Sequence, residues 1–250
     1  MTASDKTVSV IIPTYNSENY IARCINSILN QSYSPIEIII IDDCSQDATI
    51  QLVKSKYPNV KIIKNSTNLG AGISRNKGIK ESIGDYIAFC DSDDFWEKSK
   101  VEEQINQMHL LDNDFSYTSY RMINEKGKII INKSPVYNNH TLKDQLISTR
   151  ISTSSVLVKK TLLERNIFSN RRTGQDYHLW LRLLLENNAI GIDKPLTNIF
   201  RRNQSLSSNT FQSIKDVWEI QSELIQNNFF IRLKNCLFYL IDLIYKRIFL

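Results

Sequence analysis

Cysteine and histidine are scarce in this chain of 250 residues, which has four cysteines and three histidines. No two cysteines form a CxxC pair, and Cys24, Cys90 and Cys236 lie in apolar stretches. We therefore expect reduced thiols in the core of a cytoplasmic protein. So few histidines, with no cysteine pair beside them, argue against a zinc site.

Long apolar runs are also missing. No stretch of about 18 uncharged apolar residues is present, so we expect no transmembrane helix. The first residues, MTASDKTVSVII, lack a basic segment followed by an apolar one, which argues against a signal peptide. With only 7 glycines, 5 prolines and no low-complexity tract, a chain that is 42% hydrophobic is expected to form one large α/β domain.

The net charge of +5 is not accompanied by a dense run of lysine and arginine, a zinc finger or an RNA-recognition signature. The sequence therefore gives no support to a nucleic-acid partner. The basic excess lies in the last third of the chain, where it suits phosphates or anionic lipid. The residues concerned are Arg171, Arg172, Arg201, Arg202, Arg232, Lys234, Lys246 and Arg247.

The N-terminal part of the chain alternates between strand and helix patterns. Residues 36–41 are almost all isoleucine, which is typical of a central parallel strand covered on both faces. Ser17 is a candidate cap for a helix whose apolar stripe runs to Leu29. Alternating strands and helices predict a parallel sheet with right-handed crossovers and helices on both faces. The predicted strands are 8–12, 36–41, 60–64 and 86–90, and the predicted helices are 17–29, 48–57 and 73–82.

Beyond residue 100 the pattern is looser. A helical pattern covers 101–111, and two strand patterns flank Gly127. The helix expected over 176–186 has apolar residues at helical spacing. No linker separates two independent domains. The further strands expected here are 115–120, 128–131 and 156–158.

Polar residues follow three of the predicted strands where each one ends. Pro13 to Asn16 follow the first, Asp42 and Asp43 the second, and Asp91 to Asp94 the fourth. Any one cluster is an ordinary turn or helix cap. Because the carboxyl ends of parallel strands share one edge of the sheet, all five carboxylates are expected to gather there. Clustered carboxylates repel unless a cation lies among them, which favours Mg²⁺ or Mn²⁺.

A glycine-containing loop, residues 68–72, precedes the third predicted helix. A helix N-terminus binds anions, but this loop is neither of the common nucleotide-binding glycine motifs. Arg75, Asn76 and Lys77 follow on the helix, where an ordinary solvated face is the alternative to a phosphate contact.

Taken together, four segments resemble the family 2 glycosyltransferases with the GT-A fold. They are Val-Ser-Val-Ile-Ile-Pro-Thr-Tyr-Asn (8–16), Ile-Asp-Asp-Cys-Ser-Gln-Asp (41–47), Asn-Leu-Gly with Arg-Asn-Lys-Gly (75–78), and Asp-Ser-Asp-Asp (91–94). They occur in order over residues 7–96. In the second half, residues 173–182 are similar to the family segment that holds the catalytic base.

The resemblance implies a fold, a cofactor and residue roles. The fold would be a mostly parallel, Rossmann-like sheet flanked by helices, with a helical C-terminal extension. A divalent metal, Mn²⁺ or Mg²⁺, would bridge the diphosphate. Asp94 receives no definite role. By resemblance, Pro13 and Tyr15 would line the base and ribose pocket, Asp43 would bind the uracil, Asp91 the ribose or the metal, and Asp93 the metal. Arg75 and either Arg201 or Arg202 would contact the donor, and Asp176 would deprotonate the acceptor.

The sequence departs from the family pattern at two residues and one short segment. Cys44 stands where glycine is usual after the acidic pair, which changes backbone freedom but no chemistry. Gln175 replaces the usual glutamate beside the presumed base. Residues 200–203, Phe-Arg-Arg-Asn, stand where many relatives have Arg-x-His, so the choice between Arg201 and Arg202 stays open.

Asp176 has two readings. At a predicted helix start, aspartate is a preferred cap and gains from the helix dipole. The same dipole keeps the carboxylate ionised and available as a base, whose rate contribution then depends on proximity. His178 is the competing base, but it lies two residues further along the helix. We take Asp176 as the base.

The C-terminal segment, residues 229–250, is heavily apolar but interrupted by charges. It fits a helix lying in the membrane interface, with basic residues toward anionic lipid. The alternatives are a helix packed on the catalytic domain or a dimer contact. We expect one domain over 1–220, with a nucleotide-sugar half (1–96) and an acceptor half (97–220), followed by an amphipathic helix over 221–250.

The resemblance is closest to bacterial enzymes that build O-antigen or other surface polysaccharides. It implies inverting transfer of a hexose, glucose or galactose, from a UDP-sugar to an undecaprenyl-diphosphate-linked sugar, giving a β bond. The enzyme would then be cytoplasmic and peripheral on the inner face of the membrane. One alternative is a sugar-phosphate nucleotidyltransferase, although residues 13–17 lack its Gly- and Arg-rich loop. The other is an inactive nucleotide-sugar-binding scaffold, which Gln175 favours.

Overall fold

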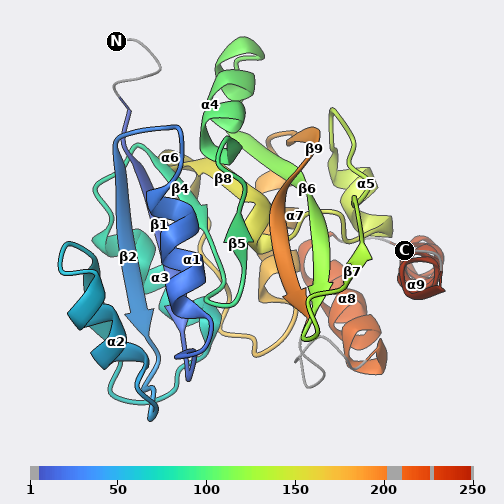
Figure 1. Cartoon of the computed structure of the whole chain (residues 1–250). Coiled ribbons are helices and arrows are strands. Elements are labelled where there is room, and N and C mark those ends of the chain that lie inside the picture. Colours follow the sequence, from blue (N-terminus) through green and yellow to red (C-terminus); the bar gives the residue numbers. More distant parts are fainter. Residues whose placement is uncertain (1–5, 202–209, 226–227, 249–250) are drawn as a thin grey trace.

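The computed structural model describes residues 6–201, 210–225 and 228–248. Within these residues a single mixed sheet of nine strands forms the centre of the molecule, with helices on both faces (Figure 1). Its strand order is β3-β2-β1-β4-β8-β6-β9-β5, and β7 pairs with β6 outside this path.

The N-terminal half of the sheet is parallel, as predicted. Its strands are β1 (Val8–Thr14), β2 (Ile36–Asp42), β3 (Lys61–Lys64) and β4 (Tyr86–Phe89), with β1 between β2 and β4. Side chains alternate between the two faces because successive residues of a strand point in opposite directions. Ile12 and Ile40 pack with α1 (Ile21–Leu29), whereas Ile11 and Ile39 pack on the face that α3 (Ala71–Glu81) covers. Helix α2 (Thr49–Lys56) completes this half.

The C-terminal half adds mainly antiparallel strand pairs. β8 (Val156–Lys159) joins β4 to β6 (Phe115–Asn124) by antiparallel pairing on both sides. β6 also pairs with β7 (Ile129–Ile131), and in parallel with the long β9 (Ile190–Arg201). The sequence predicted β6, β7 and β8 but not β9 or the short β5 (Phe95–Trp96). Asp193, Lys194 and Pro195 interrupt the apolar pattern of β9, and its pairing with β6 is irregular there.

The helical segments among the described residues of this half are α4 (Lys100–Leu110), α5 (Leu142–Ile147), the short 3₁₀ turn η2 (Thr153–Ser155), α6 (Lys160–Leu163), α7 (Gln175–Leu184), α8 (Thr210–Leu224) and α9 (Phe229–Ile248). Trp180 of α7 lies against Phe89, Phe115 and Phe168, so α7 packs on the sheet. The inner faces of α8 and α9 pack in turn on α7, where Val217 and Tyr239 join one apolar cluster.

The predicted helix cap at Ser17 is wrong. Helix α1 begins at Ile21, and no side chain caps it. The Ser17 hydroxyl lies 2.7 Å from that of Ser92 and donates to the Tyr15 carbonyl. Because the hydroxyl is engaged by the loop that follows β4, it ties the ends of β1 and β4 together and is not available to α1.

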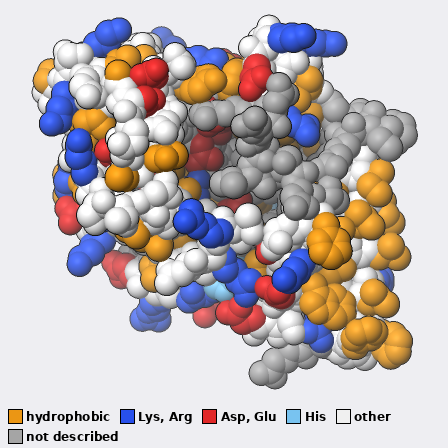
Figure 2. Space-filling model, turned by 90° about the horizontal axis from the view of Figure 1, so that it is seen from below, with side chains coloured by type: hydrophobic (Ala, Val, Ile, Leu, Met, Phe, Trp, Pro, Cys, Tyr) orange, Lys and Arg blue, Asp and Glu red, His pale blue; other side chains and the backbone are white. Residues whose placement is uncertain are grey.

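Helix α9 packs through one face only. Cys236 and Tyr239 are buried, and Asp242 forms a 3.2 Å ion pair with Arg150. The opposite face is exposed, and hydrophobic side chains gather along this edge of the molecule (Figure 2). Within the described residues, no helix has both the length and the apolar character to span a bilayer. The exposed hydrophobic residues of α9 are Phe229, Phe230, Ile231, Leu233, Leu237, Phe238, Ile241 and Ile244.

Candidate active site

A cavity of about 420 Å³ lies where the N-termini of α3 and α7 meet the inner faces of α8 and α9. Its volume falls in the range of roughly 300–1,000 Å³ that is usual for small-molecule sites. Three carboxylates line it, from three separate parts of the chain: Asp91, Asp176 and Asp216. The other polar lining residues include Arg75, Gln145, Thr149, Thr153, Arg172, Thr173, Gln175, Gln212 and Ser213, and the aromatic ones are Tyr177, Trp180 and Tyr239.

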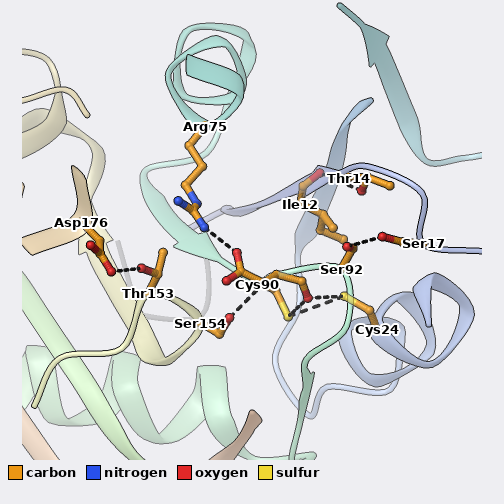
Figure 3. A network of polar contacts seen from close by, with 11 residues as sticks. Ile12, Thr14, Ser17, Cys24, Arg75, Cys90, Ser92, Thr153, Ser154 and Asp176 are labelled. Atoms are coloured by element: carbon orange, nitrogen blue, oxygen red, sulfur yellow. Dashed lines mark hydrogen bonds and ion pairs between the residues drawn. The ribbon is translucent and has the colours of Figure 1, made fainter. Parts of the chain in front are cut away.

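One end of the cavity is formed by an ion pair between α3 and the loop after β4. A guanidinium nitrogen of Arg75 lies 2.5 Å from Asp91 Oδ1, and Arg75 reaches from α3 toward the end of β4 (Figure 3). Only 5% of Arg75 is exposed, and its guanidinium lies over the Phe168 ring. Asp91 is half-buried. The pair brings two of the predicted donor-site residues together and partly neutralises the Asp91 charge.

Asp176 lies in the first turn of α7, where it faces Thr153 (Figure 3). The helix is preceded by Gly174, whose φ is +68°, so Asp176 is not the cap. Its Oδ1 accepts a 2.8 Å hydrogen bond from the backbone N–H of Tyr177, and its Oδ2 lies 3.5 Å from the Thr153 hydroxyl. Asp176 is therefore a cavity-lining carboxylate near a helix N-terminus, and its interpretation as the cap is wrong.

The competing base, His178, is not among the residues that line this cavity. It is 5% exposed, and its Nε2 lies 3.5 Å from a carboxylate oxygen of Glu223 on α8. Burial lowers its pKa, and the neighbouring Glu223 opposes that change. His178 thus joins α7 to α8.

The carboxylates at the end of β2 already accept hydrogen bonds from within the protein. Asp42 is 2% exposed and accepts a hydrogen bond from the Ser45 N–H. Asp43 is 4% exposed and accepts three, from the Asn65 amide and from the backbone N–H groups of Leu69 and Gly70. Two of its three donors belong to the glycine loop, so Asp43 holds the start of α3 in place. Any bond to a uracil would be in addition to these.

Asp94 is likewise a buried link between elements. It is 4% exposed and accepts a 2.8 Å hydrogen bond from the Phe200 N–H at the end of β9. Burial, followed by the charges of Asp91 and Asp93, raises its pKa well above the usual range. Asp94 therefore fastens the acidic loop to β9.

The five strand-end carboxylates do not form one repelling cluster, because Asp42, Asp43 and Asp94 are buried and satisfied by hydrogen bonds. The expectation that all five gather around one cation is wrong in this respect. Among the described residues, no group of three or more His, Cys, Asp or Glu side chains is arranged to hold a metal. Asp91 and Asp93 are half-buried and are the two carboxylates left to bind a cation. Oxygens of a substrate phosphate would have to supply further ligands to that cation.

The remaining predicted donor residues lie in different settings. Pro13 is buried within β1, whereas Tyr15, just beyond the strand, is 47% exposed. Cys44 has a φ of +71°, a left-handed conformation that costs roughly 1–2 kcal/mol outside glycine and explains why glycine is usual there. Arg201 is exposed at the end of β9. Arg202 lies outside the described residues.

The prediction from sequence did not include the wall of the cavity that α8 and α9 supply. Gln212 and Asp216 come from α8, and Tyr239 from α9. It also missed Gln145, whose side-chain oxygen is held 2.9 Å from Nε2 of the buried His140. None of these residues belongs to a motif. They are far apart in the sequence and come together only in the folded protein.

Comparison with known proteins gives a consistent result. A family model described as Glycosyl transferase family 2 matches residues 9–170. The putative teichuronic acid biosynthesis glycosyltransferase TuaG of Bacillus subtilis is 33% identical over 226 residues, 89% of this chain and 90% of TuaG. WfgD of Escherichia coli is a UDP-Glc:alpha-D-GlcNAc-diphosphoundecaprenol beta-1,3-glucosyltransferase. It is 33% identical over 229 residues, 89% of this chain and 88% of WfgD.

Other relatives are longer, and the chain spans only 33% of two uncharacterised glycosyltransferases from Rickettsia species. Among solved structures, S. aureus TarS 1-349 in complex with UDP-GlcNAc superimposes with a TM-score of 0.73 and 27% sequence identity. That likeness covers 86% of this chain and 64% of the TarS chain.

Proposed function

Because the chain belongs to glycosyl transferase family 2 and has the GT-A fold, we propose that it transfers a hexose from a UDP-sugar to a lipid-diphosphate-linked sugar. Its enzyme class, glycosyltransferase, is the one that the sequence predicted. UDP-glucose is the donor to test first, and a GlcNAc-diphosphate lipid the acceptor, because these are the substrates in the name of WfgD. Surface-polysaccharide synthesis is the corresponding role.

The observation that carries the proposal is one cavity shared by Asp176 and the Arg75–Asp91 pair. A transferase needs a base for the acceptor hydroxyl next to the group that holds the donor. Here the candidate base comes from α7 and the candidate donor residues from α3 and the end of β4. In the proposed site, Tyr15 and Asp43 would contact the nucleoside, and Arg201 or Arg202 the diphosphate.

The proposed reaction is a single displacement. The acceptor oxygen forms a bond to the anomeric carbon while the bond from that carbon to the phosphate oxygen of UDP breaks on the opposite side. Asp176 takes the proton of the hydroxyl, and UDP leaves with the electron pair. One displacement inverts the anomeric centre, so an α-linked donor gives a β-linked product.

Asp91, which lines the cavity, and Asp93, which is outside its lining, would supply protein ligands to a divalent cation, Mn²⁺ or Mg²⁺, and the diphosphate would supply the others. Two carboxylates plus substrate phosphates are a common set for such ions. When bound, the ion offsets the negative charge that grows on the departing diphosphate. Arg75 contributes a fixed positive charge beside the same carboxylate.

The exposed face of α9 is proposed to lie on the membrane that carries the acceptor lipid. Phe230, Leu237 and Ile241 are 74%, 56% and 52% exposed, an apolar stripe that water does not favour. The inner face of the same helix supplies Tyr239 and Leu243 to the cavity. One helix therefore connects the apolar stripe with the wall of the site, and the basic residue Lys234 lies beside Phe238.

The deciding experiment is a transfer assay that combines a panel of nucleotide sugars with a synthetic GlcNAc-diphosphate lipid, with Mn²⁺ or with EDTA. We expect transfer from one UDP-hexose, loss of transfer in EDTA, and loss of metal-dependent UDP binding in Asp93→Ala. Asp193→Ala, a surface carboxylate paired with Lys133, is the control. Tight UDP binding with no transfer to any acceptor would instead support the inactive scaffold.

A further inference from the structure

We propose that Asp216 of α8 binds a hydroxyl of the acceptor sugar adjacent to the one that Asp176 deprotonates, so that α8 and α9 select the acceptor. This inference rests on the proposed function and assigns its acceptor site. It gives the C-terminal helices a role in specificity in addition to membrane contact.

The position of Asp216 supports this role. Asp216, Gln212 and Ser213 line the same cavity as Asp176, although they come from α8 and Asp176 comes from α7. Asp216 also lies against Gly174, since a Cβ added at Gly174 would be 3.1 Å from the Asp216 Cβ. Gly174 stands two residues before Asp176, so the two carboxylates flank the start of α7.

The chemistry of Asp216 suits a sugar hydroxyl. It is 6% exposed, and its Oδ1 accepts a 2.8 Å hydrogen bond from the Gln212 side-chain amide. A carboxylate has two oxygens and about four acceptor sites, so one amide leaves capacity for a ligand hydroxyl. Gln212 fixes the orientation of the carboxylate, and hydrogen bonds to a charged acceptor are stronger than neutral ones.

The charge of Asp216 favours an uncharged acceptor sugar over a second phosphate group in the part of the cavity beside it. Arg75, which lies beside Asp91, and the exposed Arg172 provide the positive charge of the lining. Asp216 of α8 lines the cavity together with Tyr239 and Leu243 of α9. A carboxylate there repels a diphosphate but accepts hydrogen bonds from an uncharged sugar, and aromatic and aliphatic side chains suit the apolar face of a sugar ring.

The test measures acceptor discrimination in Asp216→Asn and Asp216→Ala, with Lys215→Gln as control. Lys215 is the neighbouring residue, and its exposed side chain is absent from the cavity lining. The probes are UDP-glucose, the GlcNAc-diphosphate lipid, and its single-deoxy analogues. Wild type is expected to use one deoxy analogue about 10- to 100-fold less well than the parent, as measured by kcat/KM.

In Asp216→Ala that penalty should disappear, and in Asp216→Asn it should shrink, because a neutral amide binds the hydroxyl less strongly than a carboxylate does. The KM for the parent acceptor should rise about 10- to 100-fold, while the KM for UDP-glucose changes by less than about twofold. Lys215→Gln should behave as wild type. A structural role would instead lower the Tm and reduce transfer to all acceptors equally.

The possible failures are distinguishable. If wild type transfers sugar but Asp216→Asn keeps the same preference among the deoxy acceptors, this inference is rejected and the proposed function stands. If wild type transfers no sugar from any UDP-hexose, both are rejected. Asp216→Asn keeps the shape of the side chain, so the test holds even if Asp216→Ala does not fold.

Discussion

At the scale of single residues, the structure separates carboxylates that the sequence presents as equals. Asp43 and Asp94 are buried; Asp43 accepts hydrogen bonds from the glycine loop, and Asp94 accepts one from β9. Asp91 faces a cavity and pairs with Arg75. The difference arises because a buried carboxylate must receive its hydrogen bonds from donors within the protein. Sequence motifs identify such residues but not which of them remain available to a ligand.

Asp176→Asn is expected to lose turnover by about 100-fold or more, because the amide cannot accept the acceptor proton. Binding of UDP should be unchanged, since the side chain keeps its size and its place near Thr153. Steady-state kinetics and calorimetry with UDP check the two parts. Asp193→Asn, at an exposed surface position, is the control. Turnover close to wild type in Asp176→Asn would assign the base to another group.

Gly174 and Gly127 form a matched pair that separates backbone strain from crowding. Both have positive φ, +68° and +77°, so alanine at either position should cost roughly 1–2 kcal/mol. At Gly127 an added Cβ meets nothing within 4 Å, but at Gly174 it meets Ile220 at 3.0 Å and Asp216 at 3.1 Å. Urea denaturation should therefore show a larger loss for Gly174→Ala, by about 1–3 kcal/mol. Equal losses in the free energy of unfolding would mean that α8 does not crowd Gly174 at the start of α7.

At the scale of elements, α9 has two faces with different partners. Tyr239 and Cys236 pack with Tyr177 and Leu181 of α7, and Arg150 pairs with Asp242. Deleting residues 229–250 would therefore uncover the core and remove part of the cavity wall. A truncation cannot isolate the membrane contact, and substitutions confined to the exposed face are the appropriate test.

Leu237→Glu with Ile241→Glu should reduce binding to anionic lipid vesicles by roughly tenfold or more, because two charges replace apolar side chains on the exposed face. Transfer to a short, water-soluble acceptor should persist, since neither residue lines the cavity. Vesicle co-sedimentation measures the first effect. Leu110→Glu, at an exposed leucine of α4, is the control. If the double variant binds vesicles as wild type does but has half the molecular mass of wild type in solution, this face is a dimer contact.

At the scale of the whole molecule, the buried His140 links stability to pH. Its Nδ1 lies 3.0 Å from the Tyr117 hydroxyl and its Nε2 2.9 Å from the Gln145 oxygen, which suits a neutral ring. Burial lowers its pKa from 6.5 to about 4; Gln145 and Asp144 oppose this change, and Arg150 adds to it. Between these values the unfolded chain binds a proton that the folded protein does not, so stability falls as the pH falls.

We expect this group to contribute up to about 3 kcal/mol of stability at pH 7 that is lost between about pH 6.5 and 4. In His140→Gln the contribution is absent. Urea unfolding of both proteins at intervals from pH 7 to pH 4 should show wild type more stable at pH 7 and the difference shrinking toward pH 4. A difference that stays constant over this range would show that His140 does not carry the linkage.

Much of the fold follows from local sequence. The Val and Ile residues of β1 and the isoleucine run of β2 have the composition of strands buried on both faces, and Gly70 and the acidic ends fall at the turns. β9 could not be predicted from its local sequence, because charged residues and a proline interrupt its apolar pattern. It forms a strand through its pairing with β6. A strand defined mainly by its neighbour has a weak signal of its own.

The sequence by itself determined the parallel half of the sheet, the family, and the residues of the donor motifs, because these are continuous segments whose chemistry and periodicity are local. Only the tertiary structure decided that Asp43 and Asp94 are satisfied internally, that Gly174 precedes α7, and that Asp216 shares a cavity with Asp176. The physical reason is that burial and hydrogen-bond partners depend on side chains brought together from distant parts of the chain.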